Sequence, residues 1–124
     1  MTLIDANAIL RYTLNDNLDM ASKIRDLLIK SKVFIRYEVL AEVVYVLNKV
    51  YSMSKIEIAE GIKVFLSHPN VETEAVEVMS LALETYKSFN LDFVDCILYA
   101  FKCAGCDVFT FDKKLNSMMN KINI

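Results

Sequence analysis

Glycine and proline are scarce in this chain of 124 residues, which contains 2 Gly and 1 Pro. Because these residues mark turns and loops, their scarcity excludes long irregular segments and predicts a mostly helical protein. The 3 cysteines are odd in number and lack the spacing of a disulfide framework, which argues against a secreted fold and favours a reducing cytoplasm. The formal net charge of −2 gives no cationic field that would indicate nucleic-acid binding.

Long apolar runs are also missing. The best one is interrupted by Glu42, so no stretch reaches the roughly 18 apolar residues of a membrane span. The segment Met1–Asp5 lacks the basic and apolar regions of a signal peptide. Hydrophobic residues nevertheless make up 55% of the chain, above the usual value of about 45–50%, which predicts a full core and an apolar face for a partner. The length fits a single domain over residues 1–124.

Short apolar runs alternate with longer helical patterns. The runs predict strands over Leu3–Asp5, Val33–Ile35, Asn70–Glu72 and Val108–Phe111. The patterns predict helices near Ala6–Thr13, Asp19–Ser31, Tyr37–Tyr51, Ser54–Ser67, Glu74–Phe89 and Asp92–Ala104, with a short one after Asp112. Strands separated by helices imply parallel crossovers, so we expect a small three-layer α/β/α domain with a short central parallel sheet.

Four acidic residues lie next to or inside strongly apolar segments. Asp5 and Asp112 each follow an apolar run, whereas Glu42 and Asp95 lie within apolar helical patterns. A carboxylate in such surroundings is costly unless something pairs with it. Ligands of open parallel sheets bind at the carboxyl ends of the strands, so Asp5 and Asp112 face one crevice if their strands are neighbours.

Each acid also has an ordinary structural explanation. Asp5 and Asp112 can N-cap the helices that follow them. Glu42 lies at the border of the apolar stripe of its helix, where a surface glutamate screened by Lys49 is equally expected.

The helix expected over Asp92–Ala104 is apolar nearly all round, which indicates burial. Asp92 and Asp95 can form a capping pair there, with Asp95 reaching back from the first turn. This explains Asp92 better than Asp95, which lies on the most enclosed helix of the chain.

A cluster of these acids has a strong electrostatic requirement. Two bare carboxylates roughly 4 Å apart repel by about 4 kcal/mol at an effective dielectric constant of about 20. A whole domain is stable by only about 5–15 kcal/mol, so a close cluster requires a cation or protonated members. Ligation by oxygen alone selects Mg²⁺ or Mn²⁺ over Zn²⁺.

Other motifs carry less weight. Cys103 and Cys106 have the spacing of a zinc or redox half-site, but the chain holds no second half. His68 belongs to a turn before Pro69, and no glycine-rich phosphate loop is present. A phospho-acceptor receiver domain normally has an acidic pair after its first strand, whereas Asp5 is followed by Ala6.

Four segments in this order resemble those of PIN-domain ribonucleases, and most closely the VapC-type toxins of prokaryotic toxin–antitoxin modules. They are Ile4–Asn7 with Arg11 downstream, Val39–Val43, Leu91–Leu98 and Phe109–Asp112. The resemblance covers almost the whole chain. It departs from the family at Cys96, where a small residue is frequent, and at the short C-terminus, whose final strand is at best Ile122–Ile124.

The resemblance implies hydrolysis of RNA phosphodiesters by an endoribonuclease that uses Mg²⁺ or Mn²⁺. It assigns catalysis and metal binding to an acidic quartet, which here is Asp5, Glu42, Asp95 and Asp112. It gives accessory polar roles to Asn7, Thr110 and Asp92. The cations that we expect to hold the RNA backbone are Arg11, Lys113 and Lys114.

The same resemblance implies a homodimer and a small antitoxin that wraps around the toxin. A non-toxin PIN nuclease in RNA processing and an inactive PIN-like binding scaffold are the alternatives. The toxin assignment predicts a gene for a small DNA-binding protein that overlaps the start of this one.

Overall fold

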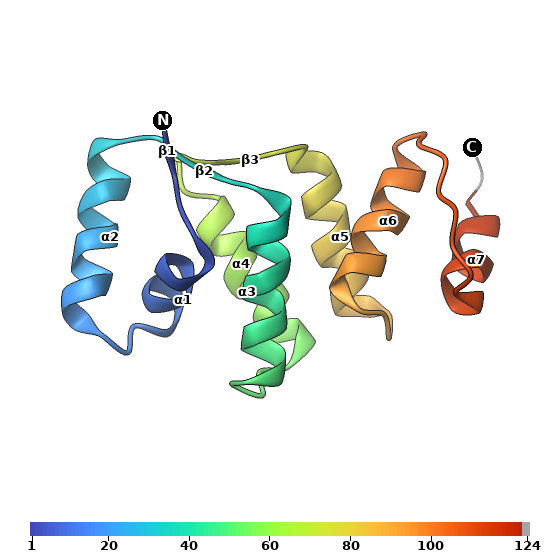
Figure 1. The fold of residues 1–124 in the computed structure, drawn as a ribbon, viewed down its shortest axis with the longest axis horizontal. Helices are drawn as coiled ribbons and strands as arrows, with labels where there is room; N and C mark the ends of the chain where they lie inside the picture. Colours follow the sequence, from blue (N-terminus) through green and yellow to red (C-terminus); the bar gives the residue numbers. More distant parts are fainter. Residues whose placement is uncertain (123–124) are drawn as a thin grey trace. The chain divides into compact units, whose positions relative to one another are not determined.

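The structure is a computed structural model that describes residues 1–122 (Figure 1). The chain forms two compact units, which we call unit 1 (Met1–Val76) and unit 2 (Glu77–Ile124). The single domain expected over residues 1–124 therefore stays a prediction.

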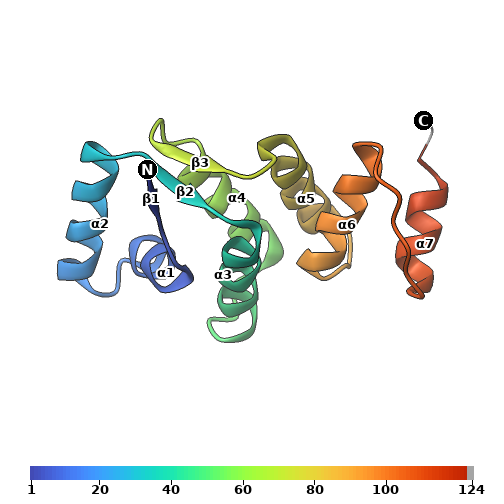
Figure 2. The same ribbon diagram turned by 45° about the horizontal axis from the view of Figure 1, so that its top comes forward.

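Unit 1 is built on a parallel sheet of three short strands. They are β1 (Thr2–Leu3), β2 (Val33–Ile35) and β3 (Val71–Thr73), in the order β1-β2-β3. Both strand pairs are parallel, and Phe34 of β2 is in register with Leu3 on one side and with Glu72 on the other. Figure 2 shows β2 between its two neighbours. The short parallel sheet expected from the sequence is confirmed.

The helices of unit 1 connect these strands. They are α1 (Ala6–Leu14) and α2 (Leu18–Lys30) before β2, and α3 (Tyr37–Lys49) and α4 (Lys55–Leu66) before β3. Both crossovers advance in the same direction across the sheet, so right-handed connections put their helices on the same face. Figure 1 shows α1–α4 below the strands.

The two faces of the sheet differ in burial as this arrangement requires. Val33 and Ile35 have 0% exposure, whereas Leu3 is 66% exposed and Phe34 is half-buried. Side chains of a strand alternate between faces, so Val33 and Ile35 point to one face and Phe34 to the other. The buried face is the one that β-branched residues of an α/β core normally occupy.

Local signals explain the helix ends. The predicted capping box is present, because Ser54 Oγ accepts from the Glu57 N–H while the Glu57 carboxylate accepts from the Ser54 N–H. Asn17 caps α2 in the simpler way, by accepting from the Met20 N–H at 3.0 Å. The helices expected from the sequence are confirmed, with ends that shift by one or two residues.

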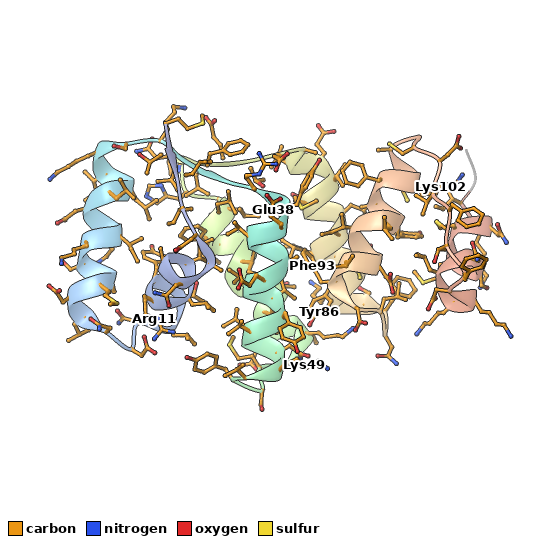
Figure 3. The ribbon with its side chains drawn as sticks, viewed as in Figure 1. Arg11, Glu38, Lys49, Tyr86, Phe93 and Lys102 are labelled. Carbon is orange, nitrogen blue, oxygen red and sulfur yellow. The ribbon has the colours of Figure 1, made fainter. Side chains whose placement is uncertain are left out.

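Unit 2 is helical in its described residues, with α5 (Val76–Ser88) leading into it and then α6 (Phe93–Cys103) and α7 (Lys113–Asn120). The rings of Tyr86 and Phe93 meet edge to face at a centroid distance of 5.6 Å (Figure 3). This contact fixes the short turn between α5 and α6. Gly105 follows α6 with a φ of 100°, a conformation that favours glycine at a helix end.

The strand predicted over Val108–Phe111 is wrong, because this segment has no regular secondary structure and pairs with none of the described strands. A β-strand needs a neighbour for its backbone hydrogen bonds, and the described part of unit 2 holds no other strand. Phe109 and Phe111 are 86% and 88% exposed, and their rings contact each other edge to face at a centroid distance of 5.2 Å. Alternating apolar residues were thus not a reliable sign of a strand in this segment.

The final strand expected at 122–124 falls on residues 123 and 124, which lie outside the described residues. Over the described residues, none of the helices combines the length and the apolar character needed to cross a membrane.

Candidate functional site

Asp5 lies directly after the first strand and is the N-cap of α1. Its Oδ1 accepts a hydrogen bond from the Ala8 N–H at 2.9 Å, so the capping role expected for Asp5 is confirmed. Nothing in the described part of the chain hydrogen-bonds to Oδ2. One oxygen of this exposed carboxylate is therefore available to a ligand.

Arg11, further along α1, is already engaged within the protein. Its Nη1 pairs with Asp16 Oδ2 at 2.6 Å, and its Nη2 donates to the Tyr51 hydroxyl at 3.2 Å. The hydrogen bond to Tyr51 is the largest of the contacts that raise the pKa of Arg11. Its Nε is buried and has no hydrogen-bond partner among the described residues. Arg11 is thus held in place by side chains that sequence reasoning missed.

The contacts of Arg11 with Asp16 and with Tyr51 differ in how far the sequence could predict them. Asp16 follows Arg11 closely, so an ion pair between them was open to prediction. Tyr51 is 40 positions away from Arg11, and its exposed position beyond α3 gives no local sign of the contact.

Glu42 lies on α3 with its side chain exposed. Figure 3 shows Glu38 and Lys49 near opposite ends of this helix. Glu38 pairs with Arg36 at 2.7 Å, and this bond lowers the pKa of Glu38. Within residues 1–122 no ion pair joins Glu42 to Lys49, so direct screening does not explain Glu42.

Asp92 and Asp95 lie at the N-terminus of α6. Asp92 is the N-cap residue, but its side chain makes no capping hydrogen bond. Asp95 lies in the first turn, and neither acidic side chain has a hydrogen bond or ion pair with another described residue. The reciprocal capping pair that we considered is therefore absent. Partial burial, and to a lesser degree the charges of Asp112 and Asp92, raise the pKa of Asp95.

Asp112 is the N-cap of α7, which confirms its capping role. Its Oδ1 accepts from the Leu115 N–H at 2.7 Å, and its own N–H donates to Thr110 Oγ1 at 3.0 Å. Asn116 Nδ2 in turn donates to the Thr110 carbonyl at 2.8 Å. Thr110 therefore fixes the backbone at Asp112 through a turn, and a strand is not needed for this.

Lys113 and Lys114 form the first turn of α7. Lys114 Nζ donates to the Asn90 carbonyl at 2.7 Å, whereas Lys113 is exposed and has no ion pair among the residues described. The two cations therefore lie beside Asp112 at a helix N-terminus, where positive charge is normally unfavourable.

The structure brings together part of the expected quartet. In unit 2 the charges of Asp95 and Asp112 act on each other, while unit 1 contains Asp5 and Glu42. Over residues 1–122, no three His, Cys, Asp or Glu side chains form a group that could hold a metal ion. That all four acids meet stays a prediction, because the quartet is divided between the two units.

Comparison with known protein families decides to which family the chain belongs. A profile described as PIN domain matches residues 2–120. The chain belongs to the PIN domain family. Searches of the curated proteins and of the solved structures found no match. The family resemblance drawn from the four sequence segments is therefore confirmed, and the toxin subtype is not part of what the match shows.

Membership in the PIN family has two consequences. PIN domains are generally nucleases, which places the chain among the hydrolases and implies RNA as its substrate. The parallel sheet and the seven helices of the described residues agree with the α/β class and the three-layer α/β/α fold expected from the sequence.

PIN nucleases typically use divalent metals, and the donors of this PIN domain fit one chemically. The candidate ligands are all carboxylates, the donor type that Mg²⁺ and Mn²⁺ prefer. Asp5 and Asp112 each use only Oδ1 in capping, and Asp95 uses neither oxygen. The mutual repulsion felt at Asp95 is the kind that a bound cation relieves.

Proposed function

We propose that this PIN domain is a Mg²⁺- or Mn²⁺-dependent endoribonuclease and the toxin component of a type II toxin–antitoxin pair. Family membership supports the nuclease activity. The resemblance of the four acidic segments, in their order and spacing, to those of VapC-type toxins supports the metal dependence and the toxin subtype. The presence of all four acids argues against an inactive scaffold, which tends to lose them.

The single observation that supports the metal site most is the state of Asp95. This carboxylate is partly buried, has two acidic neighbours and lacks any cationic partner in the described residues. The first turn of α6 favours a negative charge, but burial and two acidic neighbours oppose the ionised form of Asp95, and such a conflict is typical of functional sites. A divalent cation supplies the missing partner.

Each residue of the proposed site has a role that its surroundings allow. Asp5, Asp95 and Asp112 hold the ion through oxygens that capping leaves available. Glu42 binds a second ion directly or through water, or orients the attacking water. When bound, Mg²⁺ lowers the pKa of a coordinated water and offsets negative charge on the phosphate. Asn7, Thr110 and Asp92 are accessory polar groups that support this site.

Lys113 and Lys114 are the proposed contacts to the RNA backbone. A lysine pair in the first turn of α7 opposes the helix dipole; the Asp112 carboxylate at the N-cap offsets part of this cost, and an RNA phosphate beside the pair would offset more of it. Lys113 suits this role best, because Lys114 already donates to Asn90. Arg11 fits it less well, since Asp16 and Tyr51 occupy its guanidinium.

The proposed partners are a second copy of the chain and a cognate antitoxin. Large apolar side chains are exposed on or beside α3 and α4, and a partner that covers them would remove apolar surface from water. These side chains are Tyr45, Val50, Ile56 and Val64. Light scattering of the purified chain tests the dimer, and a monomer at high concentration contradicts it.

The decisive experiment incubates the purified full chain with total RNA, with and without Mg²⁺, and maps the new ends. We expect cleavage only when Mg²⁺ is present. Asp95→Asn should lower the rate by at least about 100-fold, since even outer-shell partners of a catalytic metal contribute about 10–100-fold. The matched control is Asp26→Asn, which removes an exposed acid of α2 and should leave the rate unchanged.

The outcomes separate the alternatives. Mg²⁺-dependent cleavage that survives Asp95→Asn contradicts the proposed metal site but not the nuclease activity. A wild-type chain that binds RNA without cutting it supports the binding scaffold. Growth arrest on expression of the wild type, relieved by a small DNA-binding protein encoded next to it, separates a toxin from an RNA-processing nuclease.

A further inference from the structure

A cavity of about 230 Å³ opens directly beside Asp5 in unit 1. Asp5, Asn7 and Arg11, all from the N-terminal part of the chain, border it, although most of its lining surface is apolar. Pockets for drug-sized ligands usually measure about 300–1,000 Å³, so this one suits a smaller group. Because Asp5 is itself part of the wall, whatever fills the cavity lies next to the proposed metal site.

The other wall of the cavity is apolar. Ala8 of α1 and Met20 and Ile24 of α2 form it, and Ile24 is buried with 8% exposure. Met20 is 44% exposed, so its flexible thioether borders the opening. A mostly apolar lining with polar residues only at its border suits a flat, largely apolar group with polar edges better than a charged one.

The contacts of Arg11 limit what it can offer to the cavity. Two of its nitrogens donate to Asp16 and Tyr51, and the third is buried. The edge of the guanidinium that would grip a phosphate is therefore largely occupied. Nucleobases stack on the planes of arginine side chains in single-stranded RNA complexes, and such stacking needs none of these three nitrogens.

The local charge agrees with a neutral ligand. Arg11 is paired with Asp16, and Lys23, which also borders the cavity, lies 3.4 Å from Asp19. The cations of the cavity are thus already neutralised, so a phosphate gains little there. A nucleobase carries no charge and offers hydrogen-bonding edges that an asparagine amide can read.

We infer that this cavity binds the nucleobase next to the scissile phosphodiester and gives the nuclease a base preference. The inference rests on the proposed nuclease function. Ala8, Met20 and Ile24 pack against one face of the base, Arg11 stacks on it, and Asn7 contacts its edge. Asp16 and Tyr51 are positioning residues, since they act through Arg11.

The test uses a short RNA with one mapped cleavage site, in which each base flanking the scissile bond is replaced in turn by an abasic ribose. For the wild type, we expect one of these replacements to lower kcat/KM by about 5- to 150-fold, the factor that corresponds to stacking of one base. The replacement on the other side of the bond should have a smaller effect.

Two variants of the cavity and one matched control complete the test. Ala8→Met fills the cavity, and Met20→Ala removes part of its wall at a half-exposed position that does not endanger folding. In both variants the loss caused by the abasic replacement should shrink to less than about 3-fold. Ile29→Ala, which truncates an exposed apolar residue of the same helix away from the cavity, should keep the full wild-type loss.

The failure of this inference differs from the failure of the proposed function. A wild type that cuts intact and abasic RNAs at equal rates overturns the base site and leaves the nuclease intact; the cavity then suits an apolar side chain of a protein partner. An abasic loss that persists in both cavity variants places the base elsewhere and also overturns the inference. A wild type that cuts no RNA refutes both proposals.

Discussion

Asp5 of unit 1 and Asp95 of unit 2 both lie at helix N-termini, but their surroundings differ. The side chain of Asp5 accepts a backbone hydrogen bond and caps α1, whereas the side chain of Asp95 makes no hydrogen bond within the described residues and has acidic neighbours. The first acid thus contributes to stability through capping, and the second reduces it. An acid that the fold does not use is the better indicator of a functional site.

The cores of the two units allow the strongest test of this comparison. Leu40 of α3 and Leu83 of α5 both have 0% exposure, so each Leu→Ala change should cost about 2–5 kcal/mol of the free energy of unfolding. If the chain is one domain, both variants lower the midpoint of a single transition in denaturant, followed by circular dichroism and tyrosine fluorescence.

The control for the core variants is Ile29→Ala, which changes a residue that is 74% exposed and should shift the free energy of unfolding by less than about 0.5 kcal/mol. Two transitions, each moved by only one of the core variants, would show that the units unfold independently. That result would contradict the single-domain prediction.

Replacing Asp5 separates its cap from its charge. Asp5→Ala removes the bond to the Ala8 N–H and should cost about 0.5–2 kcal/mol, whereas Asp5→Asn keeps a capping oxygen and should cost little. Thermal unfolding in EDTA measures both changes. Both variants should lose Mg²⁺-dependent cleavage, because the carboxylate charge is absent from each.

Asp92→Ala is the matched control at α6, since Asp92 occupies the N-cap position without a capping bond. Its cost should be clearly smaller than that of Asp5→Ala. Equal losses for the two variants would mean that the hydrogen bond at Asp5 is not the source of its contribution.

Removing the charge of Asp95 should stabilise the metal-free protein. The raised pKa of Asp95 means that the folded state holds the proton more tightly than the unfolded chain, where an Asp titrates near about 3.9. The folded state is therefore penalised increasingly as the pH rises from about 4 through the raised pKa. In EDTA, Asp95→Asn should have a higher Tm than the wild type at pH 7.

The gain from Asp95→Asn should disappear as the pH falls toward about 4, because the carboxyl is then protonated in both states. Adding Mg²⁺ at pH 7 should raise the Tm of the wild type more than that of the variant. A variant that is less stable than the wild type at neutral pH in EDTA would contradict the unpaired state of Asp95.

The smallest effect is expected at the ion pair beside the sheet of unit 1. Lys32 Nζ lies 2.9 Å from Glu72 Oε1, but the two side chains are 59% and 41% exposed. Glu72→Gln should therefore change the free energy of unfolding by at most about 1 kcal/mol, and less at high salt. A larger loss would mean that this pair holds β3 in register with β2.

The helices were the most predictable part of this protein. Ser54 and Glu57 announce the start of α4, and the apolar spacing of α3 indicates its buried face, because both signals act within a few residues. The strand predicted over Val108–Phe111 failed because pairing depends on a distant neighbour. Its alternating phenylalanines are a local pattern, which carries no information about a neighbouring strand.

In the candidate site, too, local features were predictable from the sequence and long-range contacts were not. The capping of Asp5 and Asp112 was accessible from their positions before helices, as was the charge conflict at Asp95. The contact of Arg11 with Tyr51 had no sequence signal, and it moved Arg11 from an expected phosphate contact to a wall of a cavity.

The amino-acid sequence alone determined where helices begin and which acids lie in apolar segments, since caps and apolar periodicity act over a few neighbouring residues. Only the tertiary structure decided that Phe34 lies between Leu3 and Glu72, that Tyr51 holds Arg11 and that Asp95 stays without a cationic partner among the described residues. These contacts join residues far apart in the chain. Burial of the whole core offsets the entropy lost when they approach, so no local sequence pattern indicates them.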